Sequence, residues 1–420
     1  MSTAWNSRYA LRTLRAKGST IRELLKVTQR PEVISFAGGL PAPEVFPVKR
    51  FEEACRGVLE RHGRQALQYG PTEGYEPLRE MIARNISRYG IVAETENVLV
   101  TSGSQQALDL IGKLLINSGD RVLVEAPTYL GALQAFSIYG AQFISVPVDD
   151  NGMCTGELEA SLRMSPKFMY ILPNFQNPAG VTLSEERRRQ LIFRADKYGI
   201  PIVEDDPYGQ LRYEGEHIAP LVVLDYKTLS SHDGLPPANV IYLSTFSKTL
   251  APGIRLAWVV APSDVIGKLA LLKQAADLQT STFNQMVAYE TAKDGFLDQH
   301  VKLIRQVYRE RRDAMLEALE EFFPPEVTWT HPSGGLFLWI TMPRDIDCRL
   351  LFRAALAENV AFVPGDCFYA NDVFEGCRHM RLNFSFSQPE QIHEGIRRLS
   401  MAVKMQLRRA AHPALEIVEQ

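Results

Sequence analysis

Six short apolar runs between residues 95 and 260 constrain the fold of this 420-residue chain more than any other feature. Each has the length of a β-strand, and helical segments separate most of them. The runs cover residues 98–101, 121–125, 168–172, 200–204, 240–244 and 256–260. Because almost every residue in them is apolar, both faces of the resulting sheet must be covered. The alternation predicts an α/β fold in which a mostly parallel sheet lies between helices.

One helix between these runs has clear end signals. Thr182 and Glu185 have the spacing of a capping box, which satisfies free backbone N–H groups at the start of a helix. Gly199 suits the position just after the last turn, where the backbone often becomes left-handed. We therefore expect a helix from Ser184 to Tyr198.

A different pattern begins near residue 296. A long amphipathic segment starts at Phe296, ends at Phe323 and is stopped by two prolines. The strands expected after it alternate apolar and polar residues instead of running solid. This change predicts an N-terminal arm, a large domain and a smaller α+β domain, over residues 1–45, 46–295 and 296–420.

Composition and charge exclude several classes of protein. The 46 Lys and Arg residues and the 49 Asp and Glu residues give a net charge of −3, which argues against a dedicated nucleic-acid binder. No run reaches the roughly 18 apolar residues of a membrane helix, and the N-terminus lacks the apolar core of a signal peptide. The five cysteines form no C-x-x-C pair, so no metal site and no disulfide framework is expected. Scattered thiols of this kind predict a cytoplasmic protein.

A lysine lies among hydroxyl groups between the last two apolar runs. Burial between strands and the nearby Arg255 should lower the pKa of Lys248, as an imine-forming amine requires. Thr245, Ser247 and Arg255 supply hydrogen-bond donors suited to a phosphate. A lone loop lysine would be expected to face solvent. The combination favours a buried, reactive amine beside an anion site.

Polar residues also follow two neighbouring runs. Asp205 comes directly after one of them, and Tyr208 follows three residues later. A carboxylate held beside a pyridine nitrogen keeps it protonated, which makes the ring an electron sink. The Tyr208 hydroxyl, and the amide of Asn177 after the run at 168–172, are suited to bond an oxygen on the same ring. The alternatives are a strand-end carboxylate that caps a turn and an ordinary Asn-Pro turn.

Four further residues fit the same kind of ligand. Ser104 and Gln105 open a helix after a glycine-containing turn, where free N–H groups and the helix dipole attract an anion. Tyr129 follows the run at 121–125 and is suited to stack on a flat ring. Arg381 lies in an otherwise apolar strand, and its guanidinium matches a carboxylate bidentately. The alternatives are a plain helix cap, a core tyrosine and an internal salt bridge.

Together these motifs resemble the pyridoxal 5′-phosphate (PLP) aminotransferases of fold type I over essentially the whole chain. Within that class the chain is most similar to bacterial 2-aminoadipate aminotransferases of lysine biosynthesis and to the kynurenine/aminoadipate aminotransferases. The passages that carry the closest match are residues 19–26, 35–44, 67–75 and 103–109. The resemblance implies the PLP-dependent transferase fold, with a seven-stranded type of sheet in the large domain, and a homodimer with shared active sites.

The resemblance also implies a role in cofactor binding for each matching residue. Lys248 would be the Schiff-base lysine and proton shuttle, Asp205 the partner of the pyridine nitrogen, and Tyr129 the residue stacked on the ring. Asn177 and Tyr208 would bond the 3-oxygen of the ring. The residues implied for the phosphate, the last of them reaching the neighbouring subunit, are Ser104, Gln105, Thr245, Ser247, Arg255 and Tyr69.

Four residues are implied for the substrate. Arg381 would bind the α-carboxylate, with Gly39 approaching the same group through its backbone and Asn177 beside it. Arg22, on a helix of the N-terminal arm that covers the substrate, would meet the distal carboxylate of 2-aminoadipate or glutamate. The alternative for Arg22 is a helix charge that faces solvent.

The implied reaction is a ping-pong transfer of an amino group from an L-amino acid to a 2-oxo acid, with 2-oxoglutarate as the expected acceptor. An aromatic or branched-chain aminotransferase of broad specificity is the alternative among enzymes. A PLP-binding transcriptional regulator without catalysis is the alternative from another class. For that alternative, the glycine pair at Gly38 and Gly39 comes too early to leave room for a DNA-binding domain before it. No membrane partner is expected.

Overall fold

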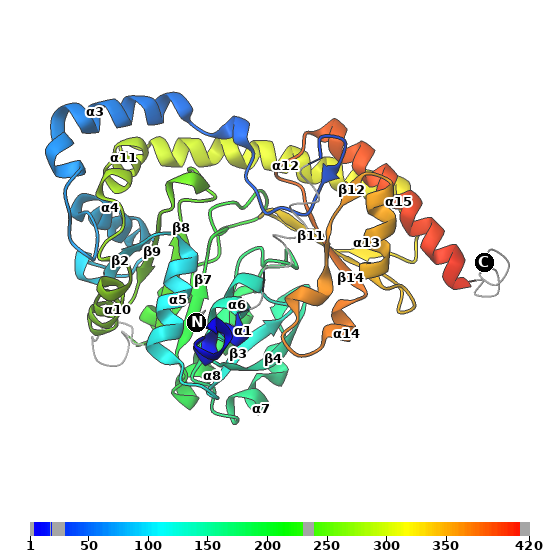
Figure 1. Ribbon diagram of the computed structural model, residues 1–420, viewed down its shortest axis with the longest axis horizontal. Coiled ribbons are helices and arrows are strands. Elements are labelled where there is room, and N and C mark those ends of the chain that lie inside the picture. The colour runs from blue at the N-terminus through cyan, green and yellow to red at the C-terminus, as the bar shows by residue number, and fades with distance from the viewer. Residues whose placement is uncertain (1–3, 17, 19–29, 230–238, 412–420) are drawn as a thin grey trace.

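An eight-stranded mixed sheet forms the centre of the larger part of the molecule (Figure 1). The computed structural model describes residues 4–16, 18, 30–229 and 239–411. The strand order is β2-β9-β8-β7-β6-β3-β4-β5. In chain order the strands are β2 (Val98–Thr101), β3 (Arg121–Ala126), β4 (Gln142–Asp149), β5 (Gly152–Met153), β6 (Phe168–Ile171), β7 (Ile202–Asp205), β8 (Val240–Thr245) and β9 (Ala257–Val260).

Strand direction brings most strand ends to one edge of this sheet. β8, β7, β6, β3 and β4 are parallel neighbours, whereas β9 is antiparallel to both β8 and β2. β2 therefore points the same way as β8. In sheets of this kind ligands bind at the carboxyl ends of the parallel strands. The predicted α/β fold with a mostly parallel sheet is confirmed.

Two strands of this sheet, β4 and β5, were not expected from the sequence. Each of the six apolar runs overlaps a strand, but β4 does not coincide with any of them. Its residues alternate between buried and more exposed positions, because it lies near the end of the sheet and pairs there only with the two-residue β5. A strand covered on one face does not produce a solid apolar run.

Helices cover both faces of the large sheet. One face packs against α5 (Ser104–Leu115), α6 (Leu130–Ile138) and α10 (Ser263–Asp277). The helices on the opposite face are α4 (Glu76–Ser87), α7 (Leu158–Leu162), α8 (Glu185–Tyr198) and α9 (Leu221–Leu229). The sheet is therefore the middle layer of three.

Helix α8 ends as predicted but begins differently. Gly199 closes it in the left-handed conformation, with φ of 62°. At the other end, Ser184 is the N-cap and its side chain accepts from Arg187 N. The Thr182 hydroxyl instead accepts from the backbone of Phe175 at 3.3 Å. The predicted capping box of Thr182 and Glu185 is therefore wrong, because Ser184 lies directly before the first helical residue.

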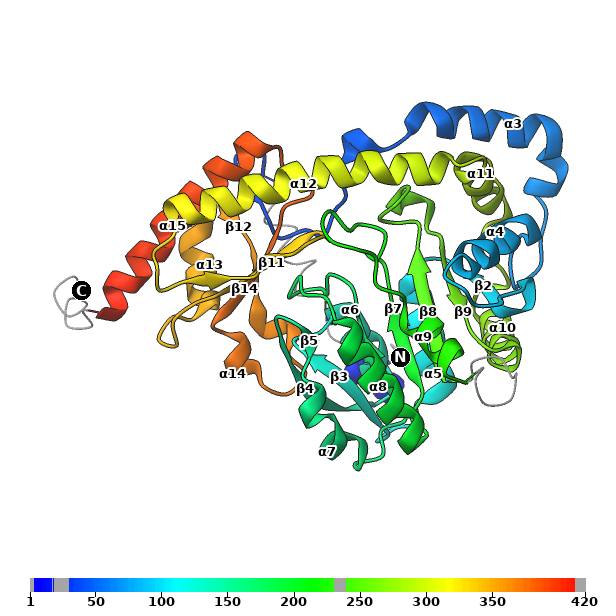
Figure 2. The same ribbon diagram turned by 180° about the vertical axis from the view of Figure 1, so that it is seen from behind.

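A second, four-stranded antiparallel sheet lies toward the C-terminus, in the order β10-β11-β14-β13. A long helix, α12, runs along the top of the molecule and contacts α11 beside the large sheet and α15 beside the small one (Figure 2). The elements of this part are α12 (Phe296–Phe322), β10 (Thr328–Trp329), β11 (Phe337–Thr341), α13 (Cys348–Ala357), β12 (Val360–Ala361), β13 (Val363–Pro364), η6 (Gly365–Phe368), α14 (Val373–Gly376), β14 (His379–Asn383) and α15 (Pro389–Ala411).

The chain before the large sheet packs partly against this small sheet. β1 (Ile34–Ser35) pairs in parallel with β12, and Phe36, Ala37 and Val45 are buried in the same hydrophobic cluster as β11 and β14. Farther on, α3 (Val48–Ala66) packs against α11 (Thr282–Ala292). Residues near 37–39 are thereby held between the two sheets.

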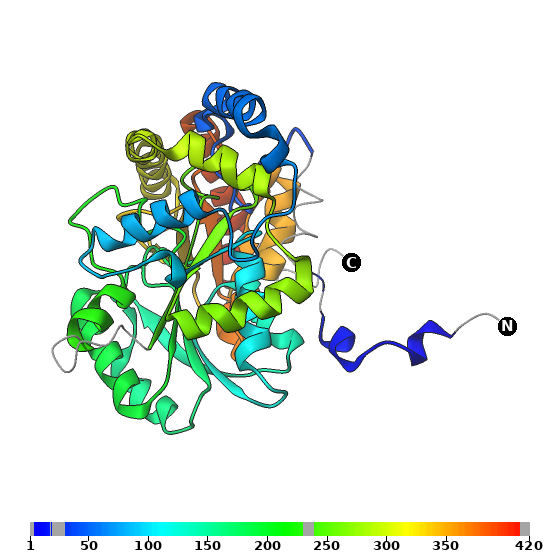
Figure 3. The ribbon, with the colours of Figure 1, turned by 90° about the vertical axis from the view of Figure 1, so that its left-hand side faces the viewer.

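Residues 4–16 extend away from the rest of the molecule (Figure 3). They carry η1 (Trp5–Ser7) and α1 (Leu11–Arg15), and Arg15 donates a hydrogen bond of 2.9 Å to Ser118 Oγ. None of the helices in the described part of the chain combines the length and the apolar character that a membrane crossing requires.

Candidate active site

The structure brings most of the expected site residues to the carboxyl edge of the large sheet. Lys248 follows β8, Asp205 ends β7, Asn177 follows β6 and Tyr129 follows β3. Ser104 follows β2 at the start of α5. Strand polarity places these side chains around one space, which the small sheet faces from the other side.

The Lys248 side chain is partly buried in this space. Its Nζ donates a hydrogen bond of 2.8 Å to the carbonyl oxygen of Gly39. Burial, followed by the positive charges of Arg381 and Arg255, lowers the pKa of Lys248 to about 8. At pH 7 about a tenth of the amine is therefore uncharged, far more than for a free lysine, and the uncharged form is the one that attacks a carbonyl group.

Asp205 presents one free oxygen to the same space. Its Oδ2 accepts a hydrogen bond of 2.7 Å from the Tyr170 hydroxyl, and its Oδ1 is buried with no partner among the described residues. The pKa of Asp205 is raised to about 7. Burial is the main cause and the neighbouring Asp206 adds to it, whereas the hydrogen bond from Tyr170 lowers the pKa. A buried carboxylate oxygen without a partner fits a protonated ring nitrogen.

Arg381 of β14 reaches across from the small sheet. Its Nη1 donates to Asn177 Oδ1 and its Nη2 to the carbonyl of Ala37, each at 2.7 Å. Its Nε is buried and has no partner within the described ranges. Burial lowers the pKa of Arg381 to about 10, and the guanidinium lies 4.3 Å from the centroid of the Phe337 ring. An anion is the missing partner of such a side chain.

Two phenols complete the wall of this space. Burial raises the pKa of Tyr208, and Asp205 is among the charges that act on it; a hydrogen bond from Asn177 opposes the shift. Burial, followed by Asp205, also raises the pKa of Tyr129. The Tyr129 ring lies against Gly131, where a Cβ atom would collide with it. Both phenols therefore stay protonated at neutral pH.

The start of α5 forms an anion cradle. Gly103 is the N-cap with φ of 91°, and the Arg255 guanidinium lies so close to it that a Cβ there would clash. Ser104 Oγ is buried and has no partner among the described residues. The Gln105 side chain donates to the carbonyl of Gly131 at 2.9 Å, so its amide already has a protein acceptor. First-turn N–H groups and the two side chains of Ser104 and Arg255 suit a phosphate.

Thr245 and Ser247 form the turn that carries Lys248. The Ser247 backbone N–H donates to Thr245 Oγ1 at 3.0 Å, and the two hydroxyl oxygens lie 2.9 Å apart. Thr245 Oγ1 also lies 3.0 Å from the carbonyl oxygen of Leu256. These bonds fix the direction in which Lys248 leaves the sheet.

One expected site residue lies apart from this group, and another falls outside the described residues. Tyr69 is 78% exposed on the surface, and Arg22 lies outside the described residues. Gly39 is in place, since its carbonyl binds Lys248 and a Cβ at this position would come within 3.1 Å of the Phe337 ring.

Sequence reasoning missed three contacts of the site: Tyr170, Ala37 and Phe337. Tyr170 and Phe337 lie within apolar strands and look like ordinary core residues in the sequence. Ala37 acts through its carbonyl oxygen, which no side-chain pattern reveals. Only the pairing of a tyrosine in one strand with a carboxylate ending the next could have suggested Tyr170.

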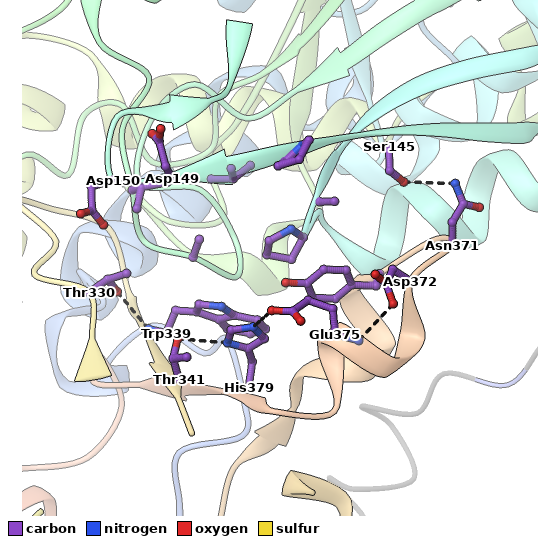
Figure 4. Close-up of a pocket in the computed structure, with 17 residues that line it drawn as sticks. Ser145, Asp149, Asp150, Thr330, Trp339, Thr341, Asn371, Asp372, Glu375 and His379 are labelled. Carbon is purple, nitrogen blue, oxygen red and sulfur yellow. Dashed lines mark hydrogen bonds and ion pairs between the residues drawn. The ribbon is translucent and has the colours of Figure 1, made fainter. Parts of the chain in front are cut away.

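A cavity of about 480 Å³ lies between the two sheets beside this site (Figure 4). Its wall includes Pro127 and Ala179, from the loops that carry Tyr129 and Asn177. His379 stacks on Trp339 with ring centroids 5.1 Å apart. Several of the charged groups here have protein partners, such as Glu375 with His379 Nε2 at 3.3 Å. The cavity is the outer part of the cleft between the sheets. Within the described ranges, no cluster of His, Cys, Asp and Glu is arranged to hold a metal ion.

Comparison with known proteins identifies the family. The profile of "Aminotransferase class I and II" matches residues 34–399. The chain belongs to this family. It is 47% identical over 408 residues to an aromatic-amino-acid aminotransferase of Thermococcus litoralis, and the match covers 96% of this chain and 95% of the relative. It is 45% identical over 402 residues to a 2-aminoadipate transaminase of Thermus thermophilus, spanning 96% of this chain and 98% of the relative.

A solved structure gives the same result. The crystal structure of LysN, an alpha-aminoadipate aminotransferase of Thermus thermophilus complexed with N-(5′-phosphopyridoxyl)-L-leucine, superposes with a TM-score of 0.89 at 42% identity. The match covers 97% of this chain and all of that one. The protein is therefore an aminotransferase that uses PLP, as predicted. Ser104 Oγ, Asp205 Oδ1 and Arg381 Nε, which lack partners among the described residues, fit the phosphate, the ring nitrogen and a substrate anion, respectively.

Proposed function

We propose that this aminotransferase moves the amino group of 2-aminoadipate or a glutamate-like amino acid to 2-oxoglutarate, with Lys248 as its catalytic residue. The observation that carries the role of Lys248 is its partly buried Nζ with a pKa lowered to about 8, in the same space as Asp205 and Arg381. The substrate proposal is supported by 45% identity to the 2-aminoadipate transaminase of Thermus thermophilus. The similar identity to an aromatic-amino-acid aminotransferase supports broad specificity as the second candidate.

We assign the cofactor contacts by the groups that each residue offers. Asp205 would pair with the ring nitrogen, Asn177 and Tyr208 would bond the 3-oxygen, and Tyr129 would stack on the ring. PLP, once bound, supplies a ring that accepts the electrons left at the substrate Cα. The phosphate contacts proposed here are Ser104, Gln105, Thr245, Ser247 and Arg255, with Tyr69 from a second subunit.

The residues of the chain divide the work of the reaction. Arg381 binds the substrate α-carboxylate through Nε and one of the two terminal nitrogens, beside Gly39 and Asn177. This contact with the α-carboxylate orients the substrate so that its Cα–H bond points toward Lys248. The uncharged Lys248 Nζ removes the Cα proton and later returns a proton within the same site, so that no outside base is needed. Burial of Arg381 and Asn177 limits the access of water to the proton transfer.

Several wider features belong to the proposal. Tyr69 is exposed and so available to a second subunit, which supports a homodimer with shared active sites. All five cysteines are free thiols, which suits a reducing, cytoplasmic location. The similarity to LysN supports a role in lysine biosynthesis. For the domains we propose boundaries at residues 1–45, 46–295 and 296–420.

The first experiment tests the link between Lys248 and PLP. Purified wild-type protein with PLP should show a visible absorbance band, which Lys248→Ala should lose while its circular dichroism stays unchanged. Failure of the wild type to take up PLP would overturn the proposal.

The second experiment tests the substrate. Amino donors including 2-aminoadipate, glutamate, leucine and phenylalanine are paired with 2-oxoglutarate, using wild type and Arg22→Ala. If Arg22 reads a distal carboxylate, kcat/KM for 2-aminoadipate should fall about 10-fold to 100-fold, the range for a lost charge-assisted bond, while leucine is unaffected. An equal response of both donors would favour the broad-specificity candidate.

A further inference from the structure

Tyr170 contacts Asp205 from within the sheet. It lies in β6, and its register partner on β7 is Val203. Asp205 is two residues beyond Val203 and therefore on the same face of the sheet. A tyrosine is long enough to span this diagonal, and the hydrogen bond from its hydroxyl to Asp205 Oδ2 measures 2.7 Å. Both side chains are buried.

The surroundings of Tyr170 fix the direction of this bond. Phe136 of α6 packs edge-on against its ring, with centroids 5.7 Å apart. Burial and the adjacent Asp205 raise the pKa of Tyr170 well above its ordinary value, so the hydroxyl keeps its single proton. That proton goes to Oδ2, whereas Oδ1 has no partner in the described part of the chain. The two oxygens of Asp205 are therefore not equivalent.

We propose that Tyr170 is a positioning residue for Asp205: it binds Oδ2, directs Oδ1 to the ring nitrogen of PLP and stabilises the charged carboxylate. This inference rests on the proposed role of Asp205. It goes beyond that role because Tyr170 touches neither cofactor nor substrate and acts through another side chain.

The charge balance around Asp205 shows why such a donor matters. Burial and the Asp206 carboxylate both oppose a negative charge on Asp205, and the bond from Tyr170 favours it. Asp205 in turn raises the pKa of Tyr129 from the start of α6 and of Tyr208 from the loop after β7. Of these groups, Tyr170 is the one that donates a hydrogen bond to the carboxylate.

The test replaces Tyr170 with Phe and uses Tyr242→Phe as a matched control. Tyr242 is also buried in the large sheet, and its hydroxyl donates to Asp206 Oδ2 at 3.1 Å. Its loss leaves Asp206 with donors from Asn174 and Gly209. Both variants thus remove one buried hydroxyl bond to a carboxylate and keep the ring, but only one of them touches Asp205.

The measurement is the dissociation constant of each full-length apoenzyme for PLP and for 1-deaza-PLP, which has C–H in place of the ring nitrogen. In Tyr170→Phe the pKa of Asp205 should rise above 7, so the carboxylate is neutral at neutral pH and regains its charge only as the pH increases. PLP binding should weaken about tenfold near pH 7, the effect of a one-unit shift, and recover toward about pH 9. Binding of 1-deaza-PLP, and both affinities in Tyr242→Phe, should stay at wild-type values.

Three outcomes would overturn the inference: unchanged PLP binding in Tyr170→Phe, an equal loss for PLP and 1-deaza-PLP, or the same loss in Tyr242→Phe. Tyr170→Phe in an Asp205→Asn background should add no further loss. If Tyr170→Phe does not fold, 3-fluorotyrosine at position 170 keeps the shape and makes a stronger donor, and should move the pH dependence of PLP binding downward; no movement contradicts the inference. Wild-type apoenzyme that fails to bind PLP would refute the proposed function instead.

Discussion

The two sides of the active site are built in different ways. On the cofactor side, polar residues come from the ends of neighbouring strands of one sheet, as with Asp205 on β7 and Lys248 after β8. On the substrate side, Arg381 comes from the small sheet, and its two hydrogen-bond partners are 204 and 344 residues away in the chain. Local sequence defines the first side, whereas the second exists only after three distant segments have packed together.

The two sides of the active site should respond differently to substitutions. The cofactor side depends on strand ends whose positions follow from a buried sheet. The substrate side depends on how the small sheet and residues 37–39 lie against the large sheet, because Ala37 and Asn177 both hold Arg381. Changes on the cofactor side should therefore alter chemistry at constant substrate affinity, and changes on the substrate side should alter KM as well.

The largest effect is expected from Asp205→Asn, which tests the cofactor side. An amide cannot keep a ring nitrogen protonated, so kcat should fall about 10³-fold, in line with the loss of one preorganised electrostatic group. The matched control is Glu125→Gln. Burial raises the pKa of Glu125 to about 8, so this carboxyl is already neutral at pH 7 and Gln is a close replacement. Steady-state kinetics with similar kcat losses in both variants would contradict the special role of Asp205.

Arg381→Lys tests the substrate side and should have the next largest effect. A lysine cannot make both bonds of a guanidinium, so kcat/KM should fall about 10²-fold for every amino donor, chiefly through KM. The control is Arg188→Lys, another fully buried arginine. Its nitrogens are all occupied by protein acceptors, among them the carbonyl oxygens of Leu183, Ala219 and Pro173. That variant should lower the melting temperature and leave KM unchanged; a normal KM in Arg381→Lys would refute the assignment.

The pH dependence of cofactor uptake gives a smaller, graded effect. Burial lowers the pKa of Lys248 to about 8. The amine is charged below that pH and becomes reactive as the pH rises through it. The rate at which apoenzyme links PLP to Lys248, followed by absorbance and trapped with borohydride, should therefore rise with a midpoint near 8 and then level off. A midpoint near the pKa of a free lysine, about 10.4, would show that water reaches and solvates the Lys248 amine.

How far the sequence predicts this molecule follows the same division. The strands, and the grouping of Lys248, Asp205 and Ser104 at one edge, were predictable because each residue follows an apolar run. The contacts of Arg381 with Ala37 and of Tyr170 with Asp205 were not, since they join residues whose own neighbourhoods look like ordinary core. Long-range packing, rather than local pattern, decides such pairs.

The start of α8 is a local feature that the sequence pattern also failed to predict, and it gives the smallest predicted effect. The sequence contains two competing caps two residues apart, Thr182 and Ser184, and only the structure shows that Ser184 accepts from Arg187 N. Ser184→Ala should cost about 1 kcal/mol in the free energy of unfolding, measured by urea denaturation, with no change in kcat. Glu185→Ala should cost less than about 0.5 kcal/mol, because Glu185 only forms an exposed pair with Arg189. If Glu185→Ala were the more damaging change, the capping box would be real. The activity of both variants should stay normal, because α8 covers the face of the sheet away from α5 and α6 and carries none of the residues assigned to PLP or substrate.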